Sequence, residues 1–218
     1  MTDYAVARFN MVEGQLKPNK VTSPALLEAM LAVPRDRFVP KAIRGIAHVD
    51  EDIPLDGGRY LMEPMVLGRL IETAAVRDSD IALVVGCGTG YSAAVLARLA
   101  NTVVALESDP DMAQTASETL AHLGVDNAVV VEGPLAEGYA KQAPYQVIVF
   151  DGAVAEIQPA ILEQLADGGR LTAVLAPEGG MGRATLYQRI GSVVSHRPVF
   201  DAAVQLLPGC APKPGFRF

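Results

Sequence analysis

Five short runs of mainly apolar residues lie between residues 81 and 175, and polar and apolar positions do not alternate within them. A strand that is buried on both faces needs apolar side chains in both directions, so these runs predict a parallel sheet with helices on both sides. The expected strands are Ile81–Val85, Thr102–Leu106, Ala128–Val131, Gln146–Phe150 and Arg170–Leu175. The expected helices between them are Tyr91–Ala100, Pro110–Leu123 and Pro159–Leu165.

The pattern changes after the fifth run. Two further runs, Thr185–Ile190 and Val193–Val199, flank Gly191-Ser192, which is typical of a two-residue hairpin turn. We expect Val204–Leu207 to add to the same edge of the sheet. A mostly parallel, seven-stranded sheet that ends in an antiparallel hairpin is typical of the Rossmann-like S-adenosylmethionine methyltransferases, and differs from the dinucleotide-binding dehydrogenases.

Several helix boundaries are marked in the sequence. Ser23 before Pro24 and Asp109 before Pro110 each predict a helix start, with a capping side chain followed by proline at the first helical position. Gly124 predicts the end of the second of these helices, because glycine adopts the left-handed conformation that often follows a last turn.

The chain is expected to have three parts. The short helices and irregular segments of residues 1–75 predict a helical N-terminal extension that packs on the main domain. The alternating strands and helices of residues 76–208 predict a single methyltransferase domain. Residues 209–218 are rich in proline and glycine, which indicates an extended tail.

Composition narrows the possible partners. Half of the 218 residues are hydrophobic and the net charge is −7 without a conspicuous Lys and Arg cluster, so we expect a globular protein with no nucleic-acid partner. The N-terminus lacks the features of a secretory signal, and the uncharged stretch Ile81–Ala97 is too short and too rich in glycine to span a membrane. The two cysteines, Cys87 and Cys210, fit a reducing compartment, so we expect a cytoplasmic protein with no membrane partner.

The first apolar run leads into a loop with glycine at every second position. Gly86, Gly88 and Gly90 allow a sharp turn and let backbone N–H groups approach a ligand, and the start of the next helix favours the ligand's negative end. A dehydrogenase would place its third glycine at Tyr91, so the spacing favours S-adenosylmethionine over NAD. Cys87 lies inside this candidate cofactor loop, where it is best explained as a small loop residue.

The second run ends in an acid. Glu107 lies about twenty residues after the glycine loop, the position from which a carboxylate accepts hydrogen bonds from both ribose hydroxyls of a nucleoside cofactor. Its neighbour Ser108 is a further candidate for cofactor contact.

Almost the whole chain resembles the protein-L-isoaspartate O-methyltransferases, which repair damaged aspartyl residues. The resemblance rests on segments spread from the N-terminus to the last expected strand. They are Met11-Val12 with Gln15-Leu16, Val33-Pro34-Arg35 with Phe38-Val39-Pro40, Gly86–Tyr91 with the helix after it, Ala143-Pro144-Tyr145, Gly168–Leu171, and Val204–Pro208. The resemblance implies a metal-free methyl transfer from S-adenosylmethionine to an isoaspartyl carboxylate of a protein or peptide. We expect a monomer or a weak dimer.

The sequence departs from the family at functional positions. Met62 stands where the family has a serine that helps to hold the substrate carboxylate, and a methionine cannot donate a hydrogen bond. Pro134 and Leu135 replace part of a Gly-Asp-Gly segment whose Asp contacts the adenine, so these two positions are the remaining cofactor-binding candidates. Val84 and Gln146 stand where acids are usual.

Asp151 follows the fourth expected strand, at the edge of the sheet where such enzymes place reactive residues. It is a candidate base or metal ligand in an altered active site, and its alternative role is to cap its own loop. Met62 and Asp151 are therefore the catalytic candidates. Three functions stay open: an isoaspartyl methyltransferase, a methyltransferase with a small-molecule acceptor, which Tyr60 and Met62 favour, and a non-catalytic cofactor-binding or interaction protein, which Pro134 and Val84 favour.

Overall fold

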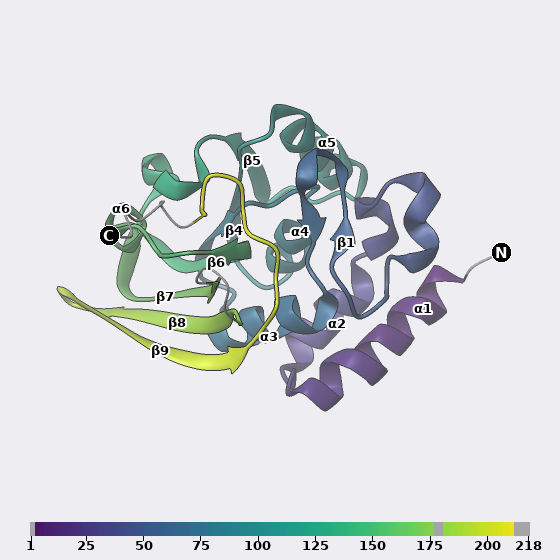
Figure 1. The fold of residues 1–218 in the computed structure, drawn as a ribbon, viewed down its shortest axis with the longest axis horizontal. Helices are drawn as coiled ribbons and strands as arrows, with labels where there is room; N and C mark the ends of the chain where they lie inside the picture. The colour runs from purple at the N-terminus through teal and green to yellow at the C-terminus, as the bar shows by residue number, and fades with distance from the viewer. Residues whose placement is uncertain (1–2, 177–180, 212–218) are drawn as a thin grey trace, which may run out of the picture.

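A computed structural model describes residues 3–176 and 181–211 of the chain. One seven-stranded sheet forms its centre, in the order β5-β4-β3-β6-β7-β8-β9 (Figure 1). Neighbouring strands are parallel from β5 to β7, and β8 and β9 are antiparallel. The strands are β3 (Ile81–Val85), β4 (Thr102–Glu107), β5 (Ala128–Glu132), β6 (Tyr145–Val154), β7 (Leu165–Leu175), β8 (Arg183–Ile190) and β9 (Val193–Asp201). This architecture confirms the expected Rossmann-like methyltransferase fold.

The central strands are buried on both faces, as their apolar runs predict. Successive residues of one strand belong to two separate hydrophobic clusters: Ala82 and Val84 pack on one side of the sheet, and Leu83 and Val85 on the other. The larger cluster includes side chains of α1 (Tyr4–Met11), α2 (Pro24–Ala32), α3 (Pro64–Ala74), α4 (Tyr91–Ala97) and α5 (Pro110–His122), and the smaller one includes α6 (Pro159–Leu162).

The helix boundaries marked by Ser23, Asp109 and Gly124 are confirmed, whereas the expected helix Tyr91–Ala100 ends earlier, at Ala97. The Ser23 hydroxyl accepts the N–H of Leu26 at 3.4 Å, and the Asp109 carboxylate accepts two N–H groups in the first turn of α5. Gly124 follows α5 with a φ of 68°. The third expected helix is shorter than predicted, because α6 ends at Leu162 and β7 begins at Leu165.

The expected position of Val204–Leu207 is wrong. This segment does not extend the hairpin edge; it runs back across the sheet, as the yellow trace after β9 shows, and Leu206 forms a parallel bridge with Ala153 of β6 (Figure 1). The Leu207 N–H donates to the carbonyl of Ala153, and the Ala153 N–H donates to that of Gln205, both at 2.8 Å. β3 ends at Val85, which pairs with Phe150, so the side of β6 that faces β3 is open beyond this point. The returning chain pairs there, while β7 continues to pair with Ala153 and Val154 on the other side.

The N-terminal 75 residues also contain a small hairpin that the sequence did not predict. β1 (Ile53–Pro54) pairs with β2 (Tyr60–Leu61) around a turn at Asp56–Gly58. The remaining short helical segments are Val12–Leu16, Lys17–Asn19, Arg35–Phe38, Lys41–Ile46, Leu135–Glu137 and Ala140–Gln142. The domain boundaries at residues 75 and 208 stay predictions, and residues 212–218 of the expected tail lie outside the described residues.

Candidate functional site

The glycine loop lies where the strand order reverses. β3 has β4 on one side and β6 on the other, so the loop after β3 opens into the crevice in which sheets of this type bind ligands. Gly86, Gly88 and Gly90 have φ values of 79°, 55° and 98°, a region that favours glycine. A Cβ at Gly86 would lie 2.6 Å from the Cδ2 of Leu207, so this position also has no room for a side chain.

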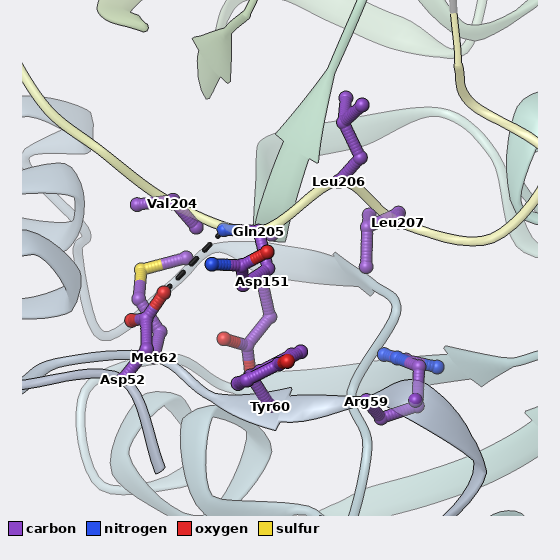
Figure 2. A pocket seen from close by; sticks show the side chains of 11 residues that line it. Asp52, Arg59, Tyr60, Met62, Asp151, Val204, Gln205, Leu206 and Leu207 are labelled. Atoms are coloured by element: carbon purple, nitrogen blue, oxygen red, sulfur yellow. Dashed lines mark hydrogen bonds between the residues drawn. The ribbon is translucent and has the colours of Figure 1, made fainter. Parts of the chain in front are cut away.

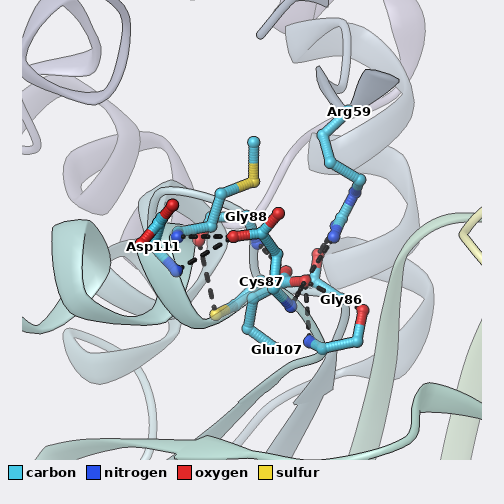
Figure 3. A network of polar contacts seen from close by, with 9 residues as sticks. Arg59, Gly86, Cys87, Gly88, Glu107 and Asp111 are labelled. Carbon is cyan, nitrogen blue, oxygen red and sulfur yellow. Dashed lines mark hydrogen bonds and ion pairs between the residues drawn. The ribbon is translucent and has the colours of Figure 1, made fainter. Parts of the chain in front are cut away.

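Glu107 reaches this loop from the end of β4 (Figure 3). Its side chain is fully buried, and one carboxylate oxygen accepts the N–H of Gly88 at 2.7 Å. The other oxygen accepts the N–H groups of Ser108 at 2.7 Å and Asp109 at 3.1 Å. The structure therefore brings together the glycine loop and the acid that the sequence predicts for a nucleoside cofactor.

Arg59 is one of the residues of this site that the sequence did not predict. It comes from the β1–β2 hairpin, it is 4% exposed, and its Nη1 lies 2.5 Å from the Oε1 of Glu107. Its Nη2 donates to the carbonyl of Gly86 at 2.9 Å (Figure 3). The sequence offers no signal for this ion pair, because an arginine after Gly57-Gly58 has the pattern of an exposed turn.

The other residues that the sequence predicts to bind the cofactor lie around the glycine loop and Glu107, and they differ in burial. Cys87 is buried, and burial raises the pKa of its thiol, so it is an inert loop residue. Gly90 packs against α5, where an added Cβ would lie 3.2 Å from that of Ala116. Ser108 is exposed beside Glu107, and Pro134 is exposed just after β5. The side chain of Leu135 lies in the smaller hydrophobic cluster.

Met62 and Asp151, the two catalytic candidates, line the same small pocket beside the glycine loop (Figure 2). Its volume is about 10 Å³, roughly the space of one water molecule. The returning segment Val204–Leu207 and the β1–β2 hairpin close it. Met62 is 1% exposed, and its carbonyl accepts a hydrogen bond of 2.7 Å from the Nη2 of the buried Arg35, which fixes the backbone here.

Asp151 is a buried carboxyl with one free oxygen. Its Oδ2 accepts the hydroxyl of Ser92, on α4, at 2.5 Å, whereas its Oδ1 is buried without a partner in the structure. Burial raises the pKa of Asp151 to about 6, although Ser92 and the positive charges of Arg59 and Arg35 oppose this shift. The hydrogen bond from Ser92, 59 residues earlier, was not predicted, since no local pattern connects the two positions.

A second carboxylate, Asp52, lines the pocket as well. Both of its oxygens have partners: Oδ1 accepts the N–H of Glu63 at 2.8 Å, and Oδ2 accepts that of Gln205 at 3.4 Å. Burial raises the pKa of Asp52. The pocket therefore combines two carboxyl groups with a thioether at the position where the resemblance implies a hydroxyl donor.

Two other departures from the family have a structural account. The Oε1 of Gln146 accepts the N–H of Ile81 at 2.8 Å, so the amide supplies an acceptor at a position where an acid is usual. Val84 is fully buried in the larger hydrophobic cluster, so β3 offers no polar side chain to a ligand at this position.

A cavity of about 610 Å³ opens on the other side of the hairpin turn, between α5 and the short helices of residues 35–46. Its lining includes positively and negatively charged side chains, and an apolar surface to which Phe38 and Leu55 contribute. It reaches Thr89 of the glycine loop, whose hydroxyl donates to the carbonyl of Phe38 at 2.6 Å. The charged lining residues are Arg37, Lys41, Arg44, Asp56, Asp109 and Asp111.

Known proteins resemble this chain over most of its length. The sequence profile of the protein-L-isoaspartate(D-aspartate) O-methyltransferase family matches residues 8–198. A protein-L-isoaspartate O-methyltransferase of Methanoculleus marisnigri is 38% identical over 85% of this chain and 84% of its own length. A second, from Koribacter versatilis, is 36% identical over 86% of this chain and 83% of its own length.

Solved structures resemble the fold. A protein-L-isoaspartate O-methyltransferase superposes with a TM-score of 0.82 at 23% identity, over 94% of this chain and 67% of its own. A Plasmodium falciparum protein, described as a putative member of this enzyme class in complex with S-adenosyl-L-homocysteine, superposes with a TM-score of 0.75 at 17% identity, over 95% of this chain and 99% of its own.

Proposed function

Because the chain belongs to the protein-L-isoaspartate(D-aspartate) O-methyltransferase family, we propose that it is an S-adenosylmethionine-dependent methyltransferase that esterifies isoaspartyl carboxylates of proteins or peptides. The observation that carries the proposal is the fully buried carboxylate of Glu107, held 2.7 Å from the N–H of Gly88 at the reversal of strand order. This arrangement fits the ribose of a nucleoside cofactor once the guanidinium of Arg59 withdraws. The family resemblance that the sequence predicts is confirmed.

In that reaction the residues of this chain bind and orient the two reacting groups, and none of them has to transfer a proton. A bound S-adenosylmethionine supplies an electrophilic methyl group. An isoaspartyl carboxylate has an ordinary pKa of about 4 and is ionised at neutral pH, so no general base is required. The protein must hold the carboxylate in line with the methyl group and exclude water. Because Met62 offers no donor, we expect the transfer to be roughly tenfold to a hundredfold slower than with a hydroxyl at this position.

The cavity beside Thr89 supports a polypeptide acceptor. Its volume of about 610 Å³ is large enough for a few residues of an extended chain, and its lining offers charges of both signs as well as apolar surface. We also propose that the protein is cytoplasmic and that it is a monomer or a weak dimer. In residues 3–176 and 181–211, no helix has both the length and the apolar character needed to cross a membrane.

The proposal is tested in two steps. Calorimetry with S-adenosylhomocysteine measures cofactor binding without turnover, and methyl transfer from labelled S-adenosylmethionine to an isoaspartyl peptide measures the reaction. The same peptide with a normal aspartyl residue is the matched control. Methylation of the isoaspartyl peptide alone supports the proposal. Cofactor binding without methylation of either peptide would contradict the acceptor, and no cofactor binding would favour a non-catalytic role.

A second candidate function follows from the two carboxyl groups of the small pocket. Asp52 and Asp151 would repel an incoming carboxylate, whereas Asp151 has a free oxygen that can accept a proton from an alcohol or an amine. This arrangement favours a methyltransferase with a neutral small-molecule acceptor. A panel of alcohols and amines, tested with the same labelled cofactor, separates it from the first proposal, because only the second predicts turnover that Asp151→Asn abolishes.

A further inference from the structure

The guanidinium of Arg59 occupies the place that a bound cofactor needs. Glu107 accepts hydrogen bonds from Gly88, Ser108, Asp109 and Arg59, so both of its oxygens are already engaged by groups of the protein. The hydroxyls of a ribose are donors that need the same oxygens. Of these partners, the three backbone N–H groups are fixed by the loop and the strand end, whereas the side chains of Arg59 and of Ser108, whose hydroxyl also donates to Oε1 at 3.3 Å, can leave, and only the arginine carries a charge.

We propose that Arg59 is an internal competitor of the cofactor, which pairs with Glu107 in the cofactor-free protein and moves to Asp151 when the cofactor binds. This inference rests on the proposed binding of S-adenosylmethionine, and it is independent of the methyl acceptor. It gives the protein a closed resting state in which its cofactor site is filled by its own side chain.

Asp151 is the partner that the structure offers to a displaced guanidinium. Arg59 and Asp151 line the same pocket (Figure 2), and the charge of Arg59 already acts on the carboxyl of Asp151. The Oδ1 of Asp151 is buried without a partner, whereas both oxygens of Asp52 accept backbone N–H groups. A guanidinium that leaves one buried carboxylate is stable only on another, because an unpaired charge in this pocket is strongly disfavoured.

The move needs no unfolding of the hairpin. The Arg59 carbonyl accepts the N–H of Leu55 at 2.7 Å, and its N–H donates to Asp56, so its backbone is fixed in the β1–β2 turn. The long side chain can therefore change its torsion angles while its Cα stays in place. The pocket volume of about 10 Å³ is the space of one water molecule and is too small for a guanidinium, so the segments that line the pocket must move apart as the arginine turns towards Asp151.

A double-mutant cycle on Arg59 and Asp151 tests this switch, with calorimetry of S-adenosylhomocysteine binding as the readout. Arg59→Gln removes the competitor and is expected to tighten binding by about tenfold or more, the usual effect of one charge-assisted hydrogen bond. Asp151→Asn removes the carboxylate that would pair with the displaced guanidinium of Arg59. In the wild-type background it is expected to weaken cofactor binding by roughly threefold to tenfold. In the Arg59→Gln background the same change is expected to have no effect.

Controls separate the switch from a structural role. Arg59→Lys keeps a positive charge and should bind with intermediate affinity, and Arg183→Gln alters an exposed arginine that does not line the pocket and should bind as the wild type does. Thermal unfolding of each variant shows that it is folded.

Three results would overturn the inference. Weaker binding by folded Arg59→Gln would mean that the arginine supports the cofactor site. An equal effect of Asp151→Asn in both backgrounds would mean that Asp151 acts on the ligand directly. No binding by any of these proteins would overturn the proposed cofactor as well, whereas binding without isoaspartyl methylation would remove only the proposed acceptor.

Discussion

Arg170, in β7, links the start of β3 to the end of α3, and its removal should cost much of the stability of the fold. Its Nη2 lies 2.7 Å from the Oδ2 of Asp80, next to the first residue of β3. The same side chain donates to the carbonyls of Ala74 and Ala75 at the end of α3, at 2.9 and 2.8 Å. Asp80 is 2% exposed, so Arg170→Ala leaves a buried carboxylate without its counter-ion. Breaking a buried pair in this way costs about 3–5 kcal/mol.

The chain contains a matched control for this prediction. Arg183 also pairs with an aspartate, Asp201, at 3.2 Å, but their side chains are 61% and 67% exposed. We expect Arg183→Ala to cost less than about 1 kcal/mol, because water screens an exposed pair. Urea unfolding followed by circular dichroism gives both free energies of unfolding. The reasoning is refuted if Arg170→Ala costs no more than Arg183→Ala, since burial would then make no difference to the pair.

Three further predictions concern the loop, a buried histidine and a helix cap. Gly86→Ala should abolish binding of S-adenosylhomocysteine in calorimetry and lower the Tm, because the new Cβ would lie 2.6 Å from Leu207; unchanged binding would contradict the role of the loop. Burial and the charge of Arg35 lower the pKa of His48 to about 4, so the unfolded chain takes up a proton near pH 6.5 before the folded protein does. Stability should therefore fall as the pH falls from 6.5 to 4, and His48→Phe should flatten this slope in urea titrations. Asp109→Ala should cost about 0.5–2 kcal/mol by the same method, as expected for an N-cap.

The core of the site could be predicted from the sequence because its signals are local. A strand buried on both faces must be apolar throughout, so β3 and β4 are visible as uninterrupted runs. The glycines of the loop and the acid at Glu107 lie directly at the ends of these runs. Each residue type is required by the backbone at its own position, and this requirement does not depend on distant parts of the chain.

Other parts of the site could not be predicted, because they depend on distant partners. Arg59 is buried only because Glu107, 48 residues later, supplies a counter-charge, and nothing near Arg59 in the sequence indicates this. Likewise, Val204–Leu207 has the pattern of an edge strand. It pairs with β6 because β3 ends opposite Phe150 and leaves the next backbone groups on that side of β6 without a neighbouring strand.

The position of Leu207 has a consequence for how the protein is made. Leu207 packs against the glycine loop at Gly86 and against Gly152, which lies in β6. It is synthesised more than a hundred residues after that loop, so the parallel strands β3 to β6 can pair in a nascent chain before Leu207 is available to cover the glycine loop. Contacts so far apart in sequence form slowly. The ability to bind a ligand should therefore arise only after residues 204–207 have been synthesised and have paired with β6, later than the pairing of the central strands.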